Sequence, residues 1–245
     1  MPTAPHDHQL RLLAVQDADL RIQQAQHRRA TLPVLAQIDE LVQLDRGLEE
    51  EAVARGTEVN DLRRAVAKAE DDVQSVRDRA ERDRARLASS STSPKDLQAL
   101  QADLEILERR TSDLEDVELE VMESLESAEA AQAEVVARRE NGVKRLRELE
   151  HERDVTFRSI DSEIEEAAQE RAAAAEGLDA GLVSLYERLR EQHGGVGAAA
   201  LEGGTCMGCH MSLNPADLRT IDTAPAEQIV RCEECGRILV RKERA

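Results

Sequence analysis

The sequence predicts a mainly α-helical protein, in which a long antiparallel coiled-coil helical hairpin precedes a small C-terminal β domain. Apolar residues recur every three or four positions over most of the chain, one short run of turn residues interrupts them, and paired cysteines follow. Phe157 and Tyr186 are the only aromatic residues, whereas 34% of the residues are charged. Compact cores draw much of their buried area from aromatic side chains, but a coiled coil needs only an aliphatic seam.

A heptad repeat predicts the first arm of the hairpin. Alternating steps of three and four residues, sustained over four heptads, are typical of a coiled coil. The apolar positions of this repeat are Val59, Leu62, Val66, Ala69, Val73, Val76, Ala80 and Leu87. Pro33 lacks the amide hydrogen that a helix interior requires, so we expect it to break or kink the arm. Gly56 and Gly142 are candidate bends because glycine lowers helix propensity.

Residues 89–93 are poor helix formers and separate this repeat from a second one. Ser93 is suited to cap a helix that has Pro94 at its first position. The second repeat begins with Leu97, Leu100, Leu104, Leu107, Leu114 and Val121. We expect the two repeats to fold back on each other with the tip near residues 89–95. A mirror register would place Leu87 against Leu97, and would bring Leu10 near Ala174.

The composition of the sequence changes after His193, where glycines become frequent. We therefore expect a coiled-coil hairpin over residues 1–193 and a separate domain over residues 194–245, with little core shared between them. Short strands are expected near residues 198–201, 229–231 and 238–240. Asn214 and Pro215 read as the cap and first residue of a short helix.

Two Cys-x-x-Cys pairs, separated by 22 residues, carry the clearest chemical signal: Cys206, Cys209, Cys232 and Cys235. Four thiolates in this pattern suit tetrahedral Zn²⁺, with bonds of about 2.3 Å. A domain of roughly 50 residues without aromatic residues has marginal stability unless a metal or a covalent cross-link stabilises it. The sequence thus predicts a C4 zinc ribbon that holds one structural Zn²⁺, in which Gly208 and Gly236 allow tight turns.

Other readings of the cysteines are weaker. Cys206 to His210 also spells a c-type haem attachment motif, but haem would leave the second pair unexplained. A redox Cys-x-x-Cys is expected within a βαβ pattern, which this sequence lacks. Iron in place of zinc remains open, since four thiolates hold both metals. His210 is expected to lie on the surface beside a ligand without being one.

With these motifs, the chain resembles the bacterial C4-type zinc ribbon proteins that carry an N-terminal coiled-coil hairpin, formerly a domain of unknown function. The resemblance rests on residues 206–215 and 229–240, with weaker echoes at residues 95–100, at Gln16-Asp17 and at Pro33. It implies zinc on the four cysteines. It also implies an adaptor role, because members are described as binding RNA or protein partners without known catalysis.

Charge and hydropathy bear on location and partners. No stretch approaches the roughly 20 apolar residues that cross a bilayer, and the first residues do not resemble a signal peptide, so we expect a cytoplasmic protein. The formal net charge is −18, which opposes binding to a polyanion except through a local basic patch. The hairpin tip is slightly basic, whereas residues 97–134 carry twelve acidic and two basic side chains.

The sequence suggests functions of three classes. The favoured one is a non-catalytic scaffold that docks a protein partner through the ribbon and the coiled coil. The alternative is RNA or DNA binding through the hairpin tip or the basic residues near the end of the chain, namely Arg231, Arg237, Arg241, Lys242 and Arg244. The ribbon has no aromatic residue on which a base could stack. An enzyme is the poorest reading, because a two-helix rod encloses no pocket and a four-thiolate zinc has no open position.

Overall fold

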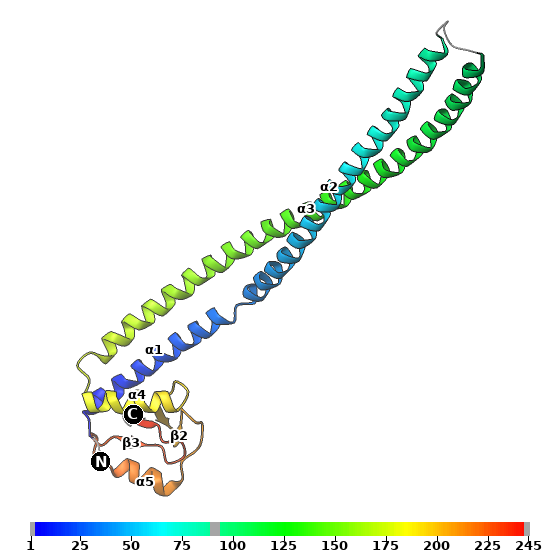
Figure 1. The fold of residues 1–245 in the computed structure, drawn as a ribbon. Helices are drawn as coiled ribbons and strands as arrows, with labels where there is room; N and C mark the ends of the chain where they lie inside the picture. Colours follow the sequence, from blue (N-terminus) through cyan, green and yellow to red (C-terminus); the bar gives the residue numbers. More distant parts are fainter. Residues whose placement is uncertain (1–2, 89–93, 243–245) are drawn as a thin grey trace. The chain divides into compact units, whose positions relative to one another are not determined.

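The computed structural model describes residues 3–88 and 94–242 and has the predicted fold class (Figure 1). Its helices are α1 (His6–Ala30), α2 (Pro33–Leu87), α3 (Pro94–Ala175), α4 (Ala180–Gln192) and α5 (Pro215–Thr223). Its strands are β1 (Ala198–Glu202), β2 (Thr205–Cys206), β3 (Val230–Arg231) and β4 (Ile238–Arg241). The chain divides into two compact units, residues 1–36 with 151–245 and residues 37–150.

The second unit, residues 37–150, is an antiparallel pair formed by most of α2 and the first part of α3. Burial follows the predicted heptads: Val59, Val73 and Ala80 are buried on α2, as are Leu107 and Val135 on α3. Ion pairs flank this seam and join the two helices; they link Arg63 to Glu129, Arg77 to Glu115, and Arg84 to Glu108. The other predicted seam positions are buried or half-buried, so the heptad prediction is confirmed as a buried to half-buried stripe on each helix.

Contacts between the two helices lie at the expected mirror register and beside it. Arg139 binds Asp45, a pair that fits this register. Gly56 lies against the side chain of Gln132, and Arg77 binds Glu115, contacts that are displaced from it by one to two helical turns. Arginine, glutamine and glutamate side chains reach along the helix, so the pairing of Leu87 with Leu97 stays a prediction.

Helix boundaries follow the sequence signals closely. The first arm breaks at Pro33, where α1 has ended at Ala30 and α2 begins. The helix α3 begins at Pro94, as expected, but the turn and Ser93 cap predicted at residues 89–93 lie outside the described residues. Gly142 lies within α3, which continues through it without interruption. No helix in the described ranges is long and apolar enough to cross a membrane.

The first unit is built around a four-stranded sheet with the order β2-β1-β4-β3. The central pair, β1 and β4, is parallel, and each edge strand is antiparallel to its neighbour. Side chains alternate across this sheet: Ala198 and Ile238 face a cluster with α1 and α4, whereas Ala199 and Leu239 face a cluster with α5. Figure 1 shows α4 and α5 on either side of the strands.

The cluster on the α1 and α4 side overturns the expectation that hairpin and ribbon share little core. Leu12 of α1 and Tyr186 of α4, both fully buried, pack together with Ile238 and Val240 of β4. Leu10 and Ala174 also pack against this cluster, as the sequence suggested. The ribbon cannot fill one face of its own sheet, because its residues are few and none is aromatic. The base of the hairpin supplies that core.

Buried polar residues of α1 join the hairpin base to the ribbon. The Gln16 side chain donates to the carbonyl of Gly195 at 2.9 Å and accepts from the amide of Gly197 at 2.7 Å. Gln9 donates to the carbonyls of Ala4 and Ala226. These amides satisfy backbone groups that would otherwise be buried without partners, which is costly.

Asp19 is the centre of a buried charge network in the same unit. Its carboxylate accepts from the Tyr186 hydroxyl at 2.6 Å and from Arg171 Nε at 2.8 Å. Glu187 binds Arg171 as well, and Arg190 approaches both acids. Burial, and then the hydrogen bond to Asp19, raises the pKa of Tyr186 above its ordinary value. Three helices, α1, α3 and α4, are thereby tied to one carboxylate.

Replacing Asp19 with Ala should destabilise the first unit by about 2–4 kcal/mol, because Arg171 and the Tyr186 hydroxyl lose a buried partner. Asp17→Ala, on the exposed side of α1, is the matched control and should cost under about 0.5 kcal/mol. Urea unfolding followed by near-ultraviolet circular dichroism of Tyr186 measures both. Equal effects of the two substitutions would contradict the assigned role of Asp19.

Candidate metal centre

Two turns of the same design present the four cysteines. Cys206 ends β2, and the amide of His210 donates back to its carbonyl at 2.8 Å. Cys232 directly follows β3, and the amide of Gly236 donates to its carbonyl at 2.7 Å. The residue after each second cysteine has a positive φ, 60° at His210 and 75° at Gly236. The chain therefore makes the same tight turn around both sides of the site.

The four sulfur atoms converge to within 4.8 Å of one another. The Cys206–Cys235 and Cys209–Cys232 sulfur separations are both 4.0 Å. A tetrahedral zinc with bonds of about 2.3 Å requires sulfur separations of about 3.8 Å, so these thiols fit the ion closely. No other metal-binding cluster of this kind is present in residues 3–88 and 94–242. The site is that of one structural Zn²⁺.

The protein environment raises the pKa of two of these thiols and lowers that of a third. Burial raises the pKa of Cys206 despite backbone amides that oppose it, and raises the pKa of Cys232 to about 12. Burial also acts on Cys235, but hydrogen bonds from the amide and side chain of Arg237 prevail and lower its pKa to about 7. Zinc must displace the remaining thiol protons, so metal binding is coupled to proton release.

An apolar cluster supports the site from behind. Leu213, Ile221 and Leu239 are buried beside Cys206 and Cys232. Gly208 was expected to provide backbone freedom, but its role here is space: a Cβ would meet that of Ala199 at 2.9 Å. His210 is exposed and is not among the grouped ligands, as expected.

The basic residues singled out from the sequence serve mostly within the fold. Arg241 donates to the carbonyls of Ile221, Ala224, Pro225, Ala226 and Gln228, and so closes the end of α5. Arg237 donates to the carbonyls of His193 and Val196. Arg231 donates to the carbonyl of Gly236, and Lys242 pairs with Glu202. Arg244 lies outside the described residues. Their proposed contacts with a partner stay a prediction.

The arrangement defines a class: a C4 zinc ribbon built onto the base of a helical hairpin. Residues 15–194 match the CT398-like coiled coil hairpin domain, and residues 205–239 match the C4-type zinc ribbon domain. The chain belongs to the CT398-like coiled coil hairpin family.

Related proteins cover nearly the whole chain. An uncharacterized protein of Mycobacterium tuberculosis is 32% identical, over 95% of this chain and 94% of its own length. A solved structure from Mycobacterium smegmatis is 33% identical, with a TM-score of 0.84 over 98% of this chain and all of that one. CT398 from Chlamydia trachomatis is 20% identical, with a TM-score of 0.68 over 97% of this chain and 98% of its own; it shows the shared fold alone.

Replacing Cys232 with Ser should abolish stoichiometric zinc binding and unfold the ribbon, because the metal supplies much of the folding free energy of such domains. Since the ribbon shares a core with α1 and α4, the near-ultraviolet signal of buried Tyr186 should change as well. The far-ultraviolet helix signal should largely persist, because the second unit has its own seam. Glu233→Ser, exposed in the same turn, is the control; a Tyr186 signal equally unchanged in both variants would contradict the shared core.

Gly236→Ala should weaken zinc binding about tenfold, because a side chain at positive φ costs about 1–2 kcal/mol. His210→Ala is the matched substitution in the other turn and should change affinity less than about threefold, since that position already carries a side chain. Competition with a chromophoric chelator measures both constants. A large loss with His210→Ala would indicate that the imidazole contributes to metal binding after all.

Proposed function

We propose that this protein is a non-catalytic, zinc-stabilised adaptor that docks protein partners through its ribbon and its coiled coil. The observation that carries the proposal is the closed site: four converging thiolates fill the coordination sphere of zinc and leave no position for water or substrate. Four free cysteines at metal-binding spacing also suit a reducing compartment, so we place the protein in the cytoplasm.

The ribbon offers a surface for docking beside its metal. Met207, between Cys206 and Cys209, and Met211, just after this pair, are 43% and 53% exposed. They adjoin β2, an edge strand of the sheet. Methionine is enriched where proteins meet proteins, because its flexible thioether adapts to varied partner surfaces. The zinc holds this turn in shape, which links metal binding to partner binding without any catalytic step.

Nucleic-acid binding, the alternative function, has less support. The guanidinium groups of Arg241 and Arg237 donate to backbone carbonyls, and Lys242 is paired with Glu202. A zinc held by four thiolates adds a local charge of about −2. Few cations of the ribbon are therefore free to bind the phosphates of a nucleic acid and so release its counterions.

The proposal is tested by capture of partners on the full-length protein, with and without nuclease treatment of the lysate. We expect a defined protein to be retained after nuclease, and to bind again when purified. Met207→Ser combined with Met211→Ser should weaken that purified complex at least about tenfold. Burial of each methionine side chain at the interface should contribute roughly 1 kcal/mol to the free energy of binding. Val155→Ser, an equally exposed position on α3, should have no effect.

Recovery that depends on intact nucleic acid would instead support the alternative. A gel-shift assay with Lys242→Ala would then be decisive, because that side chain lies on the surface. Arg241→Ala is unsuitable for this purpose, since loss of its five carbonyl contacts would disturb the fold.

A further inference from the structure

The face of α3 beside its hairpin seam carries apolar side chains that nothing in the second unit covers. Leu119, Met122 and Val136 are 58%, 45% and 40% exposed. Half-buried Val143 extends this set. Successive members are 3, 14 and 7 residues apart, so all four side chains lie on one face of the helix. Exposed apolar residues scattered singly are normal, but a row on one face indicates an interface.

One end of this row is a hollow and the other end is a ridge. The hollow, of about 480 Å³, is walled by Ala52, Val136 and Val143 and rimmed by Lys144 and Arg147, with Arg139 and Glu140. Neither Lys144 nor Arg147 has an ion-pair partner among residues 3–88 and 94–242. Leu119 and Met122 form the ridge. Leu119 cannot reach the hollow of its own chain, because Glu140 lies 21 positions further along, which is about 30 Å of helix.

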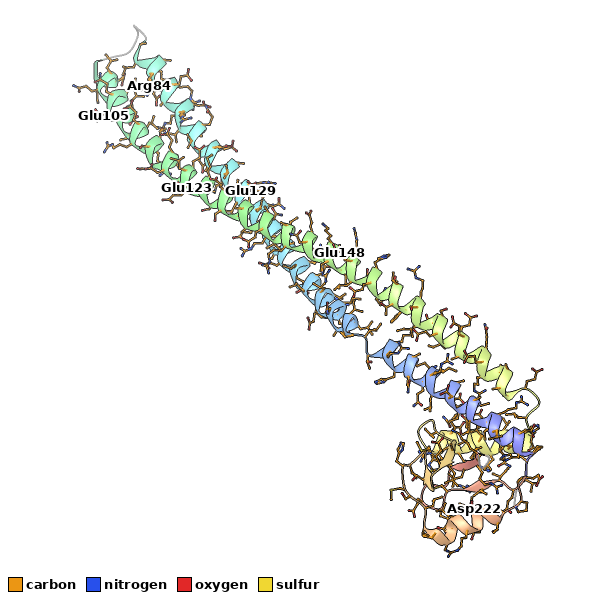
Figure 2. All side chains as sticks on the ribbon, turned by 180° about the vertical axis from the view of Figure 1, so that it is seen from behind. Arg84, Glu105, Glu123, Glu129, Glu148 and Asp222 are labelled. Atoms are coloured by element: carbon orange, nitrogen blue, oxygen red, sulfur yellow. The ribbon has the colours of Figure 1, made fainter. Side chains whose placement is uncertain are left out.

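Charge follows the same two ends. Residues 112–121, around the ridge, contain five acidic and no basic side chains. Residues 138–147, around the hollow, contain five basic side chains and one acidic one. Of the basic ones, Arg139 and Arg145 pair within the chain and Arg138 lies on another face of the helix, so Lys144 and Arg147 are those available to a partner. Two copies of α3 laid antiparallel, with Glu129 near the two-fold axis, would set each acidic stretch against a basic stretch. In Figure 2, Glu123 and Glu148 mark the two directions along α3 from Glu129.

We propose that this face of α3 binds a second copy of the chain, as an antiparallel dimer about a two-fold axis near Glu129. In this arrangement Leu119 of each copy enters the hollow of the other, and Met122 lies against Val136. Asp116 of each copy meets Lys144 of the other. Alanines at positions 130, 133 and 137 let the helices approach near the axis. Two-fold symmetry makes each contact occur twice.

A second copy is the occupant that the sequence itself supports. A foreign partner would need to match both the ridge and the hollow, whereas one reversed copy of α3 provides an acidic ridge for a basic hollow at the required spacing. Complementary charges of this kind set orientation and partner choice.

Sedimentation velocity of the full-length protein over a wide concentration range tests the proposal. We expect a reversible dimer whose dissociation constant rises at least about tenfold for Lys144→Glu and for Asp116→Lys, because each broken pair occurs twice. Leu119→Lys should abolish the dimer. An equimolar mixture of Lys144→Glu and Asp116→Lys should form heterodimers again, since every cross pair is then attractive.

Matched controls lie on other faces of the same helix. Val117→Lys and Arg138→Glu repeat the same changes of charge away from the proposed contact, and should leave the dimer intact. Circular dichroism shows whether each variant keeps its helix content. A monomer at all concentrations, a dimer insensitive to Leu119→Lys and Lys144→Glu, or failure of the mixture to restore association would each overturn the proposal. Occupation of this face by a different protein, with no self-association, would overturn it too.

Discussion

Scarcity of large apolar side chains is the constraint on which the rest of this structure depends. The ribbon has a four-stranded sheet with two faces to cover, but no aromatic residue with which to cover them. Zinc on four thiolates, backed by Leu213 and Ile221, stabilises one face. Helices α1 and α4 bring Leu12 and Tyr186 to the other. The metal site therefore supports one face of the sheet and the hairpin base covers the other, so the ribbon depends on both.

Polar contacts make that shared core specific. Apolar packing alone tolerates sliding, whereas the Gln16 amide must meet the backbone of Gly195 and Gly197, and Asp19 must meet Tyr186 and Arg171. A displaced α1 would leave these buried groups unpaired, at a cost comparable to a lost hydrogen bond for each. The side chains that fix α1 against the ribbon are therefore few and identifiable.

Sequence reasoning succeeded where a local pattern has a local cause. Heptads predicted which residues of α2 and α3 are buried, Pro33 and Pro94 marked helix starts, and cysteine spacing predicted the metal. It failed where the cause is tertiary. The ion pairs between the arms, such as Arg77–Glu115 and Arg139–Asp45, were not predicted, because periodicity identifies the apolar seam and not the charged residues that meet beside it. The shared core was missed because residues 178–192 resemble one more stretch of coiled coil.

The arginines near the end of the chain show most clearly how composition can mislead. Read as charges, Arg237 and Arg241 suggested a surface for a polyanion. In the fold they are donors: Arg241 satisfies five carbonyls around the end of α5, and Arg237 joins the second cysteine turn to the loop after α4. Arginine suits this task because its five donors lie in a fixed plane and its charge is permanent. These two arginines therefore hold irregular backbone in place, so their positive charge alone does not identify a surface for nucleic acid.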